Sequence, residues 1–123
     1  MSGWKLNFTD KYERDHKQYE KKHPDELMAI LNNLDFYFST LDELGNPYLI
    51  KAGFIHPESR GIIAIDQKGG KRRVKLQQTR LYVYPDIQGK ILHLLTIGDK
   101  NSQKMDIKFC VDIVKQIKKG EPQ

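Results

Sequence analysis

The sequence predicts one α+β domain, in which an N-terminal strand and a helical hairpin pack on a small, mainly antiparallel sheet of about four strands, followed by a C-terminal helix. Three observations predict this class. Apolar and aromatic side chains recur at helical spacing over residues 11–44, at a spacing of two over residues 62–97, and again at helical spacing over residues 107–117. The length of 123 residues supports one domain. We place it at residues 1–119, with 120–123 as a flexible tail.

The first third of the chain is predicted to form a strand and two helices. Residues 5–8 alternate polar and apolar side chains, and Thr9 or the next residue can cap a helix over about residues 11–22. Pro24 suits the first position of a helix, and Gly45 suits the left-handed residue that follows one, so a second helix is expected between them. Because the link between the two helices is short, they are expected to be antiparallel.

The middle of the chain is predicted to form three further strands. Residues 62–65 form the first, Gly69-Gly70 is the strongest hairpin signal, and Val74 to Tyr84 forms the next, closed by Pro85. A turn then leads into a strand from Lys90 to Ile97, and the apolar stripe over residues 107–117 predicts the last helix. The helical hairpin is expected on one face of the sheet, and the other face is expected to be partly open and basic.

Composition excludes several classes of protein. The net charge is +5, and residues 46–100 hold ten basic and four acidic side chains, so the middle of the chain is its basic part. No apolar run is long enough to span a membrane, and the N-terminus lacks the apolar stretch of a signal peptide, so we expect a cytoplasmic protein with no membrane partner. The single cysteine, Cys110, excludes an intramolecular disulfide and makes a zinc finger implausible.

The predicted strand from Val74 to Tyr84 carries the first candidate functional residues. Arg80, Tyr82 and Tyr84 alternate with apolar residues, so one face carries a guanidinium and two phenols. Cations beside tyrosines can bind a phosphate backbone, and further cations follow the glycine turn: Lys71, Arg72, Arg73 and Lys75. The alternative is that Arg80 is an ordinary paired charge and that the cations after the turn form a solvated hairpin tip. The tyrosines can equally pack under a helix.

Two histidines are further candidates, and each has a structural alternative. His93 lies in an apolar strand, where a core histidine is the more ordinary role and a catalytic histidine the less ordinary one. His56 lies in a loop near the basic strands and is a candidate substrate contact. The histidines on the first helix are too far apart for one metal ion, and we expect no metal site.

Two short stretches, in this order of elements, resemble the toxins of the RelE/ParE superfamily, including its HigB-like branch. Residues 79–84, TRLYVY, are similar to the YRhhY strand of that family, in which h is hydrophobic. Residues 94–100, LLTIGDK, are similar to its last strand and basic exit, and residues 101–104, NSQK, are similar to the K.sQ turn of HigB-like members. At the level of element order the resemblance covers about residues 5–118.

The resemblance implies a small α+β toxin that is neutralised by an acidic segment of an antitoxin. Ribonuclease members of the family cut mRNA in the ribosomal decoding site without a metal ion or other cofactor, so the implied partners are an antitoxin, the ribosome and mRNA. In this reaction the 2′-hydroxyl attacks the adjacent phosphorus. Cationic donors stabilise the charge that develops on the phosphorane, while other groups move protons.

The resemblance also implies roles for single residues. Arg80 matches the strand arginine that binds phosphate, and Lys100 matches the basic residue after the last strand. Lys71, Arg72, Arg73, Lys75 and Lys104 are expected to bind the RNA backbone. Known members carry a tyrosine or histidine near the C-terminus as acid or base, but none follows His93 here. Proton transfer is therefore expected from His93 or Tyr82, with Tyr84 and Asp99 as alternatives.

Two other functions remain open from the sequence. One is a non-catalytic protein with the same fold that binds nucleic acid or regulates another target. The missing C-terminal tyrosine or histidine favours this function. The other is a structural protein. RNA binding with a steep salt dependence but without cleavage would identify the first, and neither toxicity nor nucleic-acid affinity would identify the second.

Overall fold

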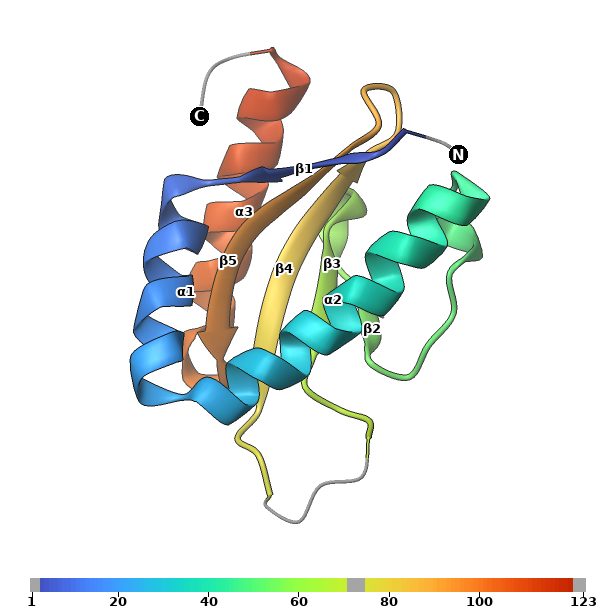
Figure 1. Ribbon diagram of the computed structural model, residues 1–123. Coiled ribbons are helices and arrows are strands. Elements are labelled where there is room, and N and C mark those ends of the chain that lie inside the picture. Colours follow the sequence, from blue (N-terminus) through green and yellow to red (C-terminus); the bar gives the residue numbers. More distant parts are fainter. Residues whose placement is uncertain (1–2, 71–74, 121–123) are drawn as a thin grey trace.

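The protein forms three helices and a five-stranded mixed sheet (Figure 1). This computed structural model describes residues 3–70 and 75–120. The helices and strands follow in the order β1 (Lys5–Phe8), α1 (Asp10–Lys22), α2 (Pro24–Leu44), β2 (Ile55–Pro57), β3 (Ile63–Asp66), β4 (Thr79–Asp86), β5 (Ile91–Asp99) and α3 (Gln103–Lys118). The α+β class expected from the sequence is confirmed.

The strands lie in the order β1-β5-β4-β3-β2. β1 is parallel to β5, and the other neighbours are antiparallel. The sheet has five strands, where the sequence predicted about four, because β2 was missed. β2 is three residues long and ends in Pro57, so it is too short to show the alternation by which a strand is recognised.

Both predicted helix ends in the N-terminal part are confirmed. The Thr9 hydroxyl accepts a hydrogen bond from the Tyr12 amide at 3.0 Å and so caps α1. α2 ends at Gly45, whose φ of 72° is the left-handed conformation that glycine adopts without steric cost. The two helices meet at His23, and from there α1 lies along β5 while α2 crosses β4 and β3 (Figure 1).

One core lies between the sheet and the α1–α2 side. Ile30, Tyr37 and Leu41 of α2 are fully buried against apolar strand residues such as Leu81 and Leu92. In the described part of the chain, no helix is long and apolar enough to cross a membrane.

A second core lies between the sheet and α3, on the face for which the sequence predicts a partly open and basic surface. Cys110 and Val114 of α3 pack there with Tyr82 and Leu95. Arg80, Tyr82 and Tyr84 do share this face, as predicted, but α3 covers its middle. The face is therefore only partly open, because the ring of Tyr82 is a large apolar surface that fits beneath a helix.

The connection from β3 to β4 is longer than the predicted glycine hairpin. β4 begins at Thr79, so residues 67–78 separate the two strands, and Pro85 lies inside β4. Gly69 and Gly70 both have positive φ, and the last β3–β4 pair in the described ranges is Asp66 with Arg80. Asn33 of α2 fixes the first end of this connection. Its side-chain amide donates to the backbone carbonyls of Asp66 and Lys68, both at 2.8 Å.

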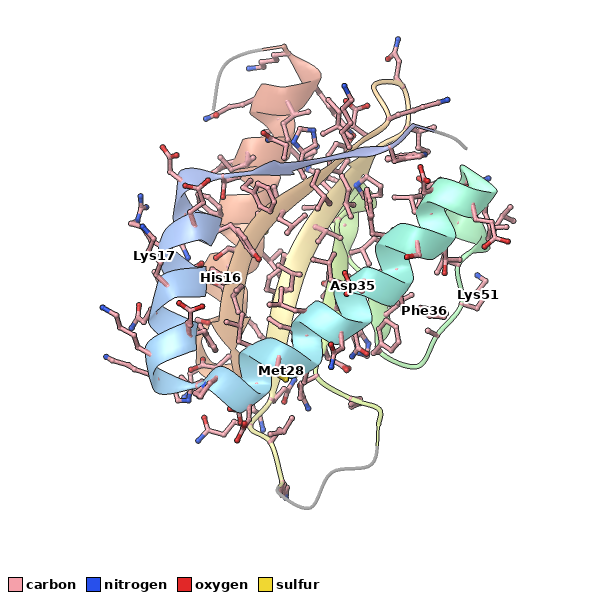
Figure 2. All side chains as sticks on the ribbon, in the orientation of Figure 1. His16, Lys17, Met28, Asp35, Phe36 and Lys51 are labelled. Carbon is pink, nitrogen blue, oxygen red and sulfur yellow. The ribbon has the colours of Figure 1, made fainter. Side chains whose placement is uncertain are left out.

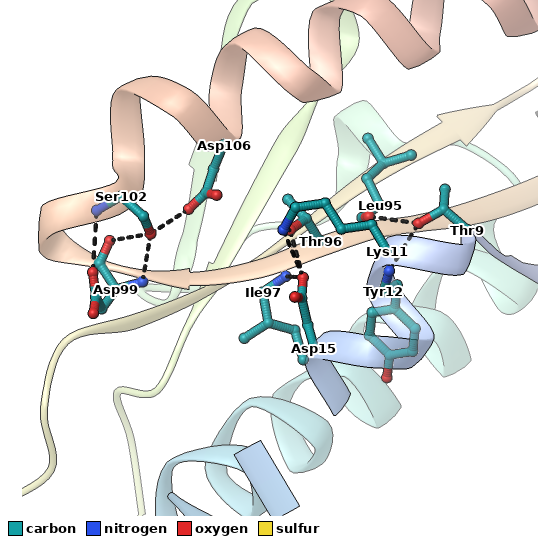
Figure 3. A network of polar contacts seen from close by, with 10 residues as sticks. All are labelled: Thr9, Lys11, Tyr12, Asp15, Leu95, Thr96, Ile97, Asp99, Ser102 and Asp106. Carbon is teal, nitrogen blue, oxygen red and sulfur yellow. Dashed lines mark hydrogen bonds and ion pairs between the residues drawn. The ribbon is translucent and has the colours of Figure 1, made fainter. Parts of the chain in front are cut away.

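α1 replaces a strand along part of the edge of β5. β1 pairs with β5 only as far as Leu94, which leaves the next backbone groups of β5 without a strand partner on that side. The Thr9 hydroxyl donates to the Leu95 carbonyl at 2.6 Å, and the Asp15 carboxylate accepts from the Ile97 amide at 3.0 Å. Figure 3 shows this network, in which Lys11 and Thr96 also contact Asp15. Side chains of α1 thus satisfy the edge that β1 leaves open.

Gly98 of β5 lets the start of α3 approach the sheet closely. A Cβ atom at this position would lie 1.8 Å from Oδ2 of Asp106 and 2.5 Å from Oγ of Ser102. These two side chains are hydrogen-bonded to each other at 2.7 Å, and the Asp99 carboxylate accepts from the Ser102 amide at 3.1 Å (Figure 3). The turn into α3 is therefore built on a position that admits no side chain.

We expect Gly98→Ala to lower the free energy of unfolding by about 1–3 kcal/mol, the range for forcing an extra carbon into a packed site. Gly53→Ala is the matched control, because a Cβ at Gly53 meets nothing within 4 Å. Urea denaturation of both variants measures the difference. Equal stability of the two variants would show that α3 moves aside at no cost.

Candidate functional site

Arg80 is the predicted site residue from which the structure builds a polar site. It lies on β4 opposite Asp66 of β3 and Gly98 of β5. Its side chain is 19% exposed, so the guanidinium is mostly desolvated but still reachable. Nη1 lies 3.4 Å from Oε2 of Glu58, while Nε is buried and has no hydrogen-bond partner among the described residues. The guanidinium therefore retains a donor for a further acceptor.

A histidine and a carboxylate lie next to Arg80 in the sheet. Nε2 of His56 is 2.5 Å from Oδ2 of Asp66, and the side chain of Asp66 is only 3% exposed. The other oxygen of Asp66 accepts from the Lys68 amide at 2.7 Å, and the Lys68 ammonium lies 3.8 Å from Oδ2. The carboxylate is thus fixed by its own loop and positions the imidazole.

Strand register places these groups on one face. His56 pairs with Ala64, which pairs with Tyr82, and Asp66 pairs with Arg80. Side chains of directly paired residues point to the same side of a sheet. His56 and Glu58 lie two residues apart and also share a side. His56, Glu58, Asp66 and Arg80 therefore surround the small side chain of Ala64, beside the region of β4 and β5 that α3 covers.

Basic side chains gather at the adjacent end of the sheet. Lys75 and Lys100 are exposed and line one hollow, formed by residues 75–78 and 99–101. Asp99, which precedes Lys100, pairs with Thr79, which precedes Arg80. Lys104 is exposed in the first turn of α3. The predicted RNA-binding residues Lys71, Arg72 and Arg73 lie outside the described residues.

His93 lies in the sheet away from Arg80. It pairs with Tyr84, four residues along β4 from Arg80, which corresponds to about 13 Å of strand. His93 is 5% exposed, and its imidazole stacks on the Tyr84 ring. Its Nδ1 accepts a hydrogen bond from the side-chain amide of Asn7 at 3.0 Å. Burial lowers the pKa of His93 below the ordinary value of a histidine, although the nearby Asp86 carboxylate acts in the opposite direction. The structure places this residue in the core.

Tyr82 is also buried. The side chain is fully enclosed beneath α3, and its hydroxyl has no hydrogen-bond partner among the described residues. Burial, together with the Asp106 carboxylate, raises the pKa of the Tyr82 phenol far above its ordinary value. A phenol without access and with a raised pKa is a poor proton carrier, so we leave it out of the site.

Sequence reasoning identified Arg80, Lys75 and Lys100 but missed Glu58 and Asp66. His56 was considered only as a contact, and its partner was not foreseen. The available signal was the pattern His56-x-Glu58 two residues apart, which would have placed both on one strand face had β2 been recognised. Pairing with Asp66 depends on the β2–β3 register, which a three-residue strand does not reveal.

Comparison with family models, with curated proteins and with solved structures gave no match. In the described ranges, no group of three His, Cys, Asp or Glu side chains is arranged to hold a metal ion. What the site can do therefore follows from its own side chains. A partly free guanidinium and nearby lysines can hold an anion, and an imidazole fixed by a carboxylate can move a proton.

The buried His93 predicts a pH dependence of stability. Because its folded-state pKa is lowered, the unfolded chain binds a proton that the native protein does not. This contribution to stability is fully present above about pH 6.5, the ordinary histidine pKa, and is lost as the pH falls through the folded pKa. Urea denaturation at pH 8, 7, 6 and 5 should show a smaller loss for His93→Gln than for the wild type. An equal loss of unfolding free energy in the two proteins would show that His93 does not cause the pH dependence.

Proposed function

We propose that this protein is a RelE/HigB-like toxin of a toxin–antitoxin pair, an endoribonuclease that cuts mRNA on the ribosome. One observation carries the proposal: the half-buried Arg80 guanidinium, with a free buried donor, lies beside the His56–Asp66 pair and near the exposed Lys75 and Lys100. The order of strand, two helices, strands and helix is compatible with the resemblance in the sequence.

The proposed reaction matches the chemistry of these side chains. Attack of a 2′-hydroxyl on the adjacent phosphorus places extra negative charge on the phosphate oxygens. Arg80 supplies donors at a largely desolvated position, where their interaction with that charge is stronger than in water. Lys75 and Lys100, which are exposed, hold the flanking phosphates. The cations thus come from the chain itself, and the proposed step uses no metal ion.

The test is a translating extract supplied with purified protein, in which the 5′ ends of a reporter mRNA are mapped. The wild type should produce cuts at defined positions in codons only when ribosomes are present. Arg80→Ala should lower cleavage by at least 100-fold, the typical effect of removing a donor to the transition-state charge. Lys17→Ala is the charge-matched control, because Lys17 is exposed on α1 and points away from the sheet (Figure 2).

A folded Arg80→Ala variant that still cuts at the wild-type rate would remove Arg80 from the site. Intact mRNA with the wild type, together with salt-dependent retardation of RNA, would replace the toxin by a non-catalytic nucleic-acid-binding protein. The burial of His93 and Tyr82, the two proton carriers expected from the sequence, is the observation that favours this second function.

Glu58 should compete with RNA for Arg80. Its carboxylate lies 3.4 Å from Nη1 of the guanidinium, where a phosphate would compete with it. We expect Glu58→Gln to tighten RNA binding by about three- to tenfold, equivalent to about 1 kcal/mol for a partly buried ion pair. Fluorescence anisotropy with a labelled RNA at 100 mM salt measures the affinity, and Glu43→Gln on the exposed side of α2 controls for net charge. The same gain in both variants would show that only net charge matters.

A further inference from the structure

We propose that His56 is the general base of the cleavage reaction and that Asp66 positions it. This inference rests on the proposed function and names the residue that moves the proton, in place of His93 and Tyr82. It is carried by the geometry of the pair and by its position relative to Arg80.

The hydrogen bond to Asp66 determines which imidazole nitrogen is free. An ionised carboxylate accepts only, so Nε2 of His56 donates its proton to Oδ2 across the 2.5 Å contact. In the neutral ring Nδ1 then carries the lone pair. Among the described residues, none is hydrogen-bonded to Nδ1, and the His56 side chain is 29% exposed. Nδ1 is therefore the ring nitrogen that remains open to a substrate.

The His56–Asp66 pair would be an unfavourable choice if it only held two strands together, because it buries a charge. The Asp66 carboxylate is almost completely buried, and burying a charge has a free-energy cost unless it is well paired. Two apolar side chains would hold β2 against β3 without that cost. An imidazole fixed by a buried carboxylate is instead the usual arrangement for a histidine that moves protons.

Arg80 reaches the strand that carries His56. Its Nη1 is 3.4 Å from Glu58, and Glu58 follows His56 by two residues on the same face, about 7 Å along the strand. A phosphate that replaces Glu58 on the guanidinium would therefore lie within one nucleotide of Nδ1. The 2′-hydroxyl of that nucleotide can then approach the base while Arg80 holds the phosphate oxygens.

Nδ1 of His56 takes the proton of the 2′-hydroxyl, and the 2′-oxygen forms a bond to phosphorus. The bond from phosphorus to the 5′-oxygen breaks, and its electron pair leaves with that oxygen. Water protonates the departing 5′-oxygen, and the hydroxide so formed takes the proton back from His56. The products are a 2′,3′-cyclic phosphate and a 5′-hydroxyl end.

Four charged groups surround the imidazole. Asp66 and Lys68 lie on β3 and the following loop, Glu58 directly follows β2, which carries His56, and Arg80 lies on β4. General-base catalysis needs the neutral imidazole, so the cleavage rate should rise with pH and then become constant. Asp66→Asn removes the carboxylate that positions the imidazole, so the cleavage rate should fall.

The experiment uses ribosomes programmed with a short mRNA and saturating protein, and measures the single-turnover rate between pH 5.5 and 8.5. His56→Ala and His56→Gln should lose at least 100-fold in rate and lose the rising part of the profile. Binding to the same mRNA with a 2′-deoxy nucleotide at the cut should change less than twofold. Added imidazole should restore part of the rate of His56→Ala. His16→Gln, a histidine on α1, should match the wild type.

Each result decides between defined alternatives. Cleavage that depends on Arg80 but proceeds at the wild-type rate and with the same profile in both His56 variants would overturn this inference and leave the proposed function in place. Intact mRNA with the wild type would overturn both. If the alanine variant does not fold, the glutamine variant and the wild-type pH profile give the answer.

Discussion

The need to pair every buried backbone group of β5 organises this fold. β5 lies beside β4 on one edge and β1 on the other, but β1 ends opposite Leu94. The remaining edge is satisfied by Thr9 and Asp15, the cap and a carboxylate of α1. Because these bonds fix α1 against the strand, α2 starts at a defined point and crosses the sheet from there. On the opposite side of β5, Gly98 brings α3 down onto the same strand.

Much of the fold follows from local sequence signals, and the exceptions have physical reasons. Pro24 and Gly45 delimit α2 because proline and glycine act through their own backbone geometry. The faces of β5 could not be read by simple alternation, because Tyr82 pairs with Thr96 while Val83 pairs with Leu94. Leu95 is thus an extra residue that reverses the alternation. As a result Ile97 faces the same core as Leu94, whereas Leu95 faces α3.

Residues of the candidate site could be predicted only where a single position in the sequence shows an unusual side chain. Arg80 is identified by a charge at a strand position between apolar neighbours. The His56–Asp66 pair arises instead from the register of β2 on β3, a property of two segments that are ten residues apart. The sequence left His93 open between a core residue and a proton carrier, and its burial favours the core role. For Tyr82, sequence reasoning could not tell a phenol that stacks on a base from one that packs beneath a helix.

The ion pair between Glu58 and Arg80 sets a threshold for occupation of the site. In the resting protein the guanidinium already has a counterion on its own chain, so a weakly held anion gains little by replacing it. Inorganic phosphate and mononucleotides, which are abundant in cells, offer a single contact of that kind. A long polyanion can add contacts at Lys75 and Lys100 in the same event and so exceed the threshold. Under the proposed function, this carboxylate would favour a long polyanion over small metabolites at the site.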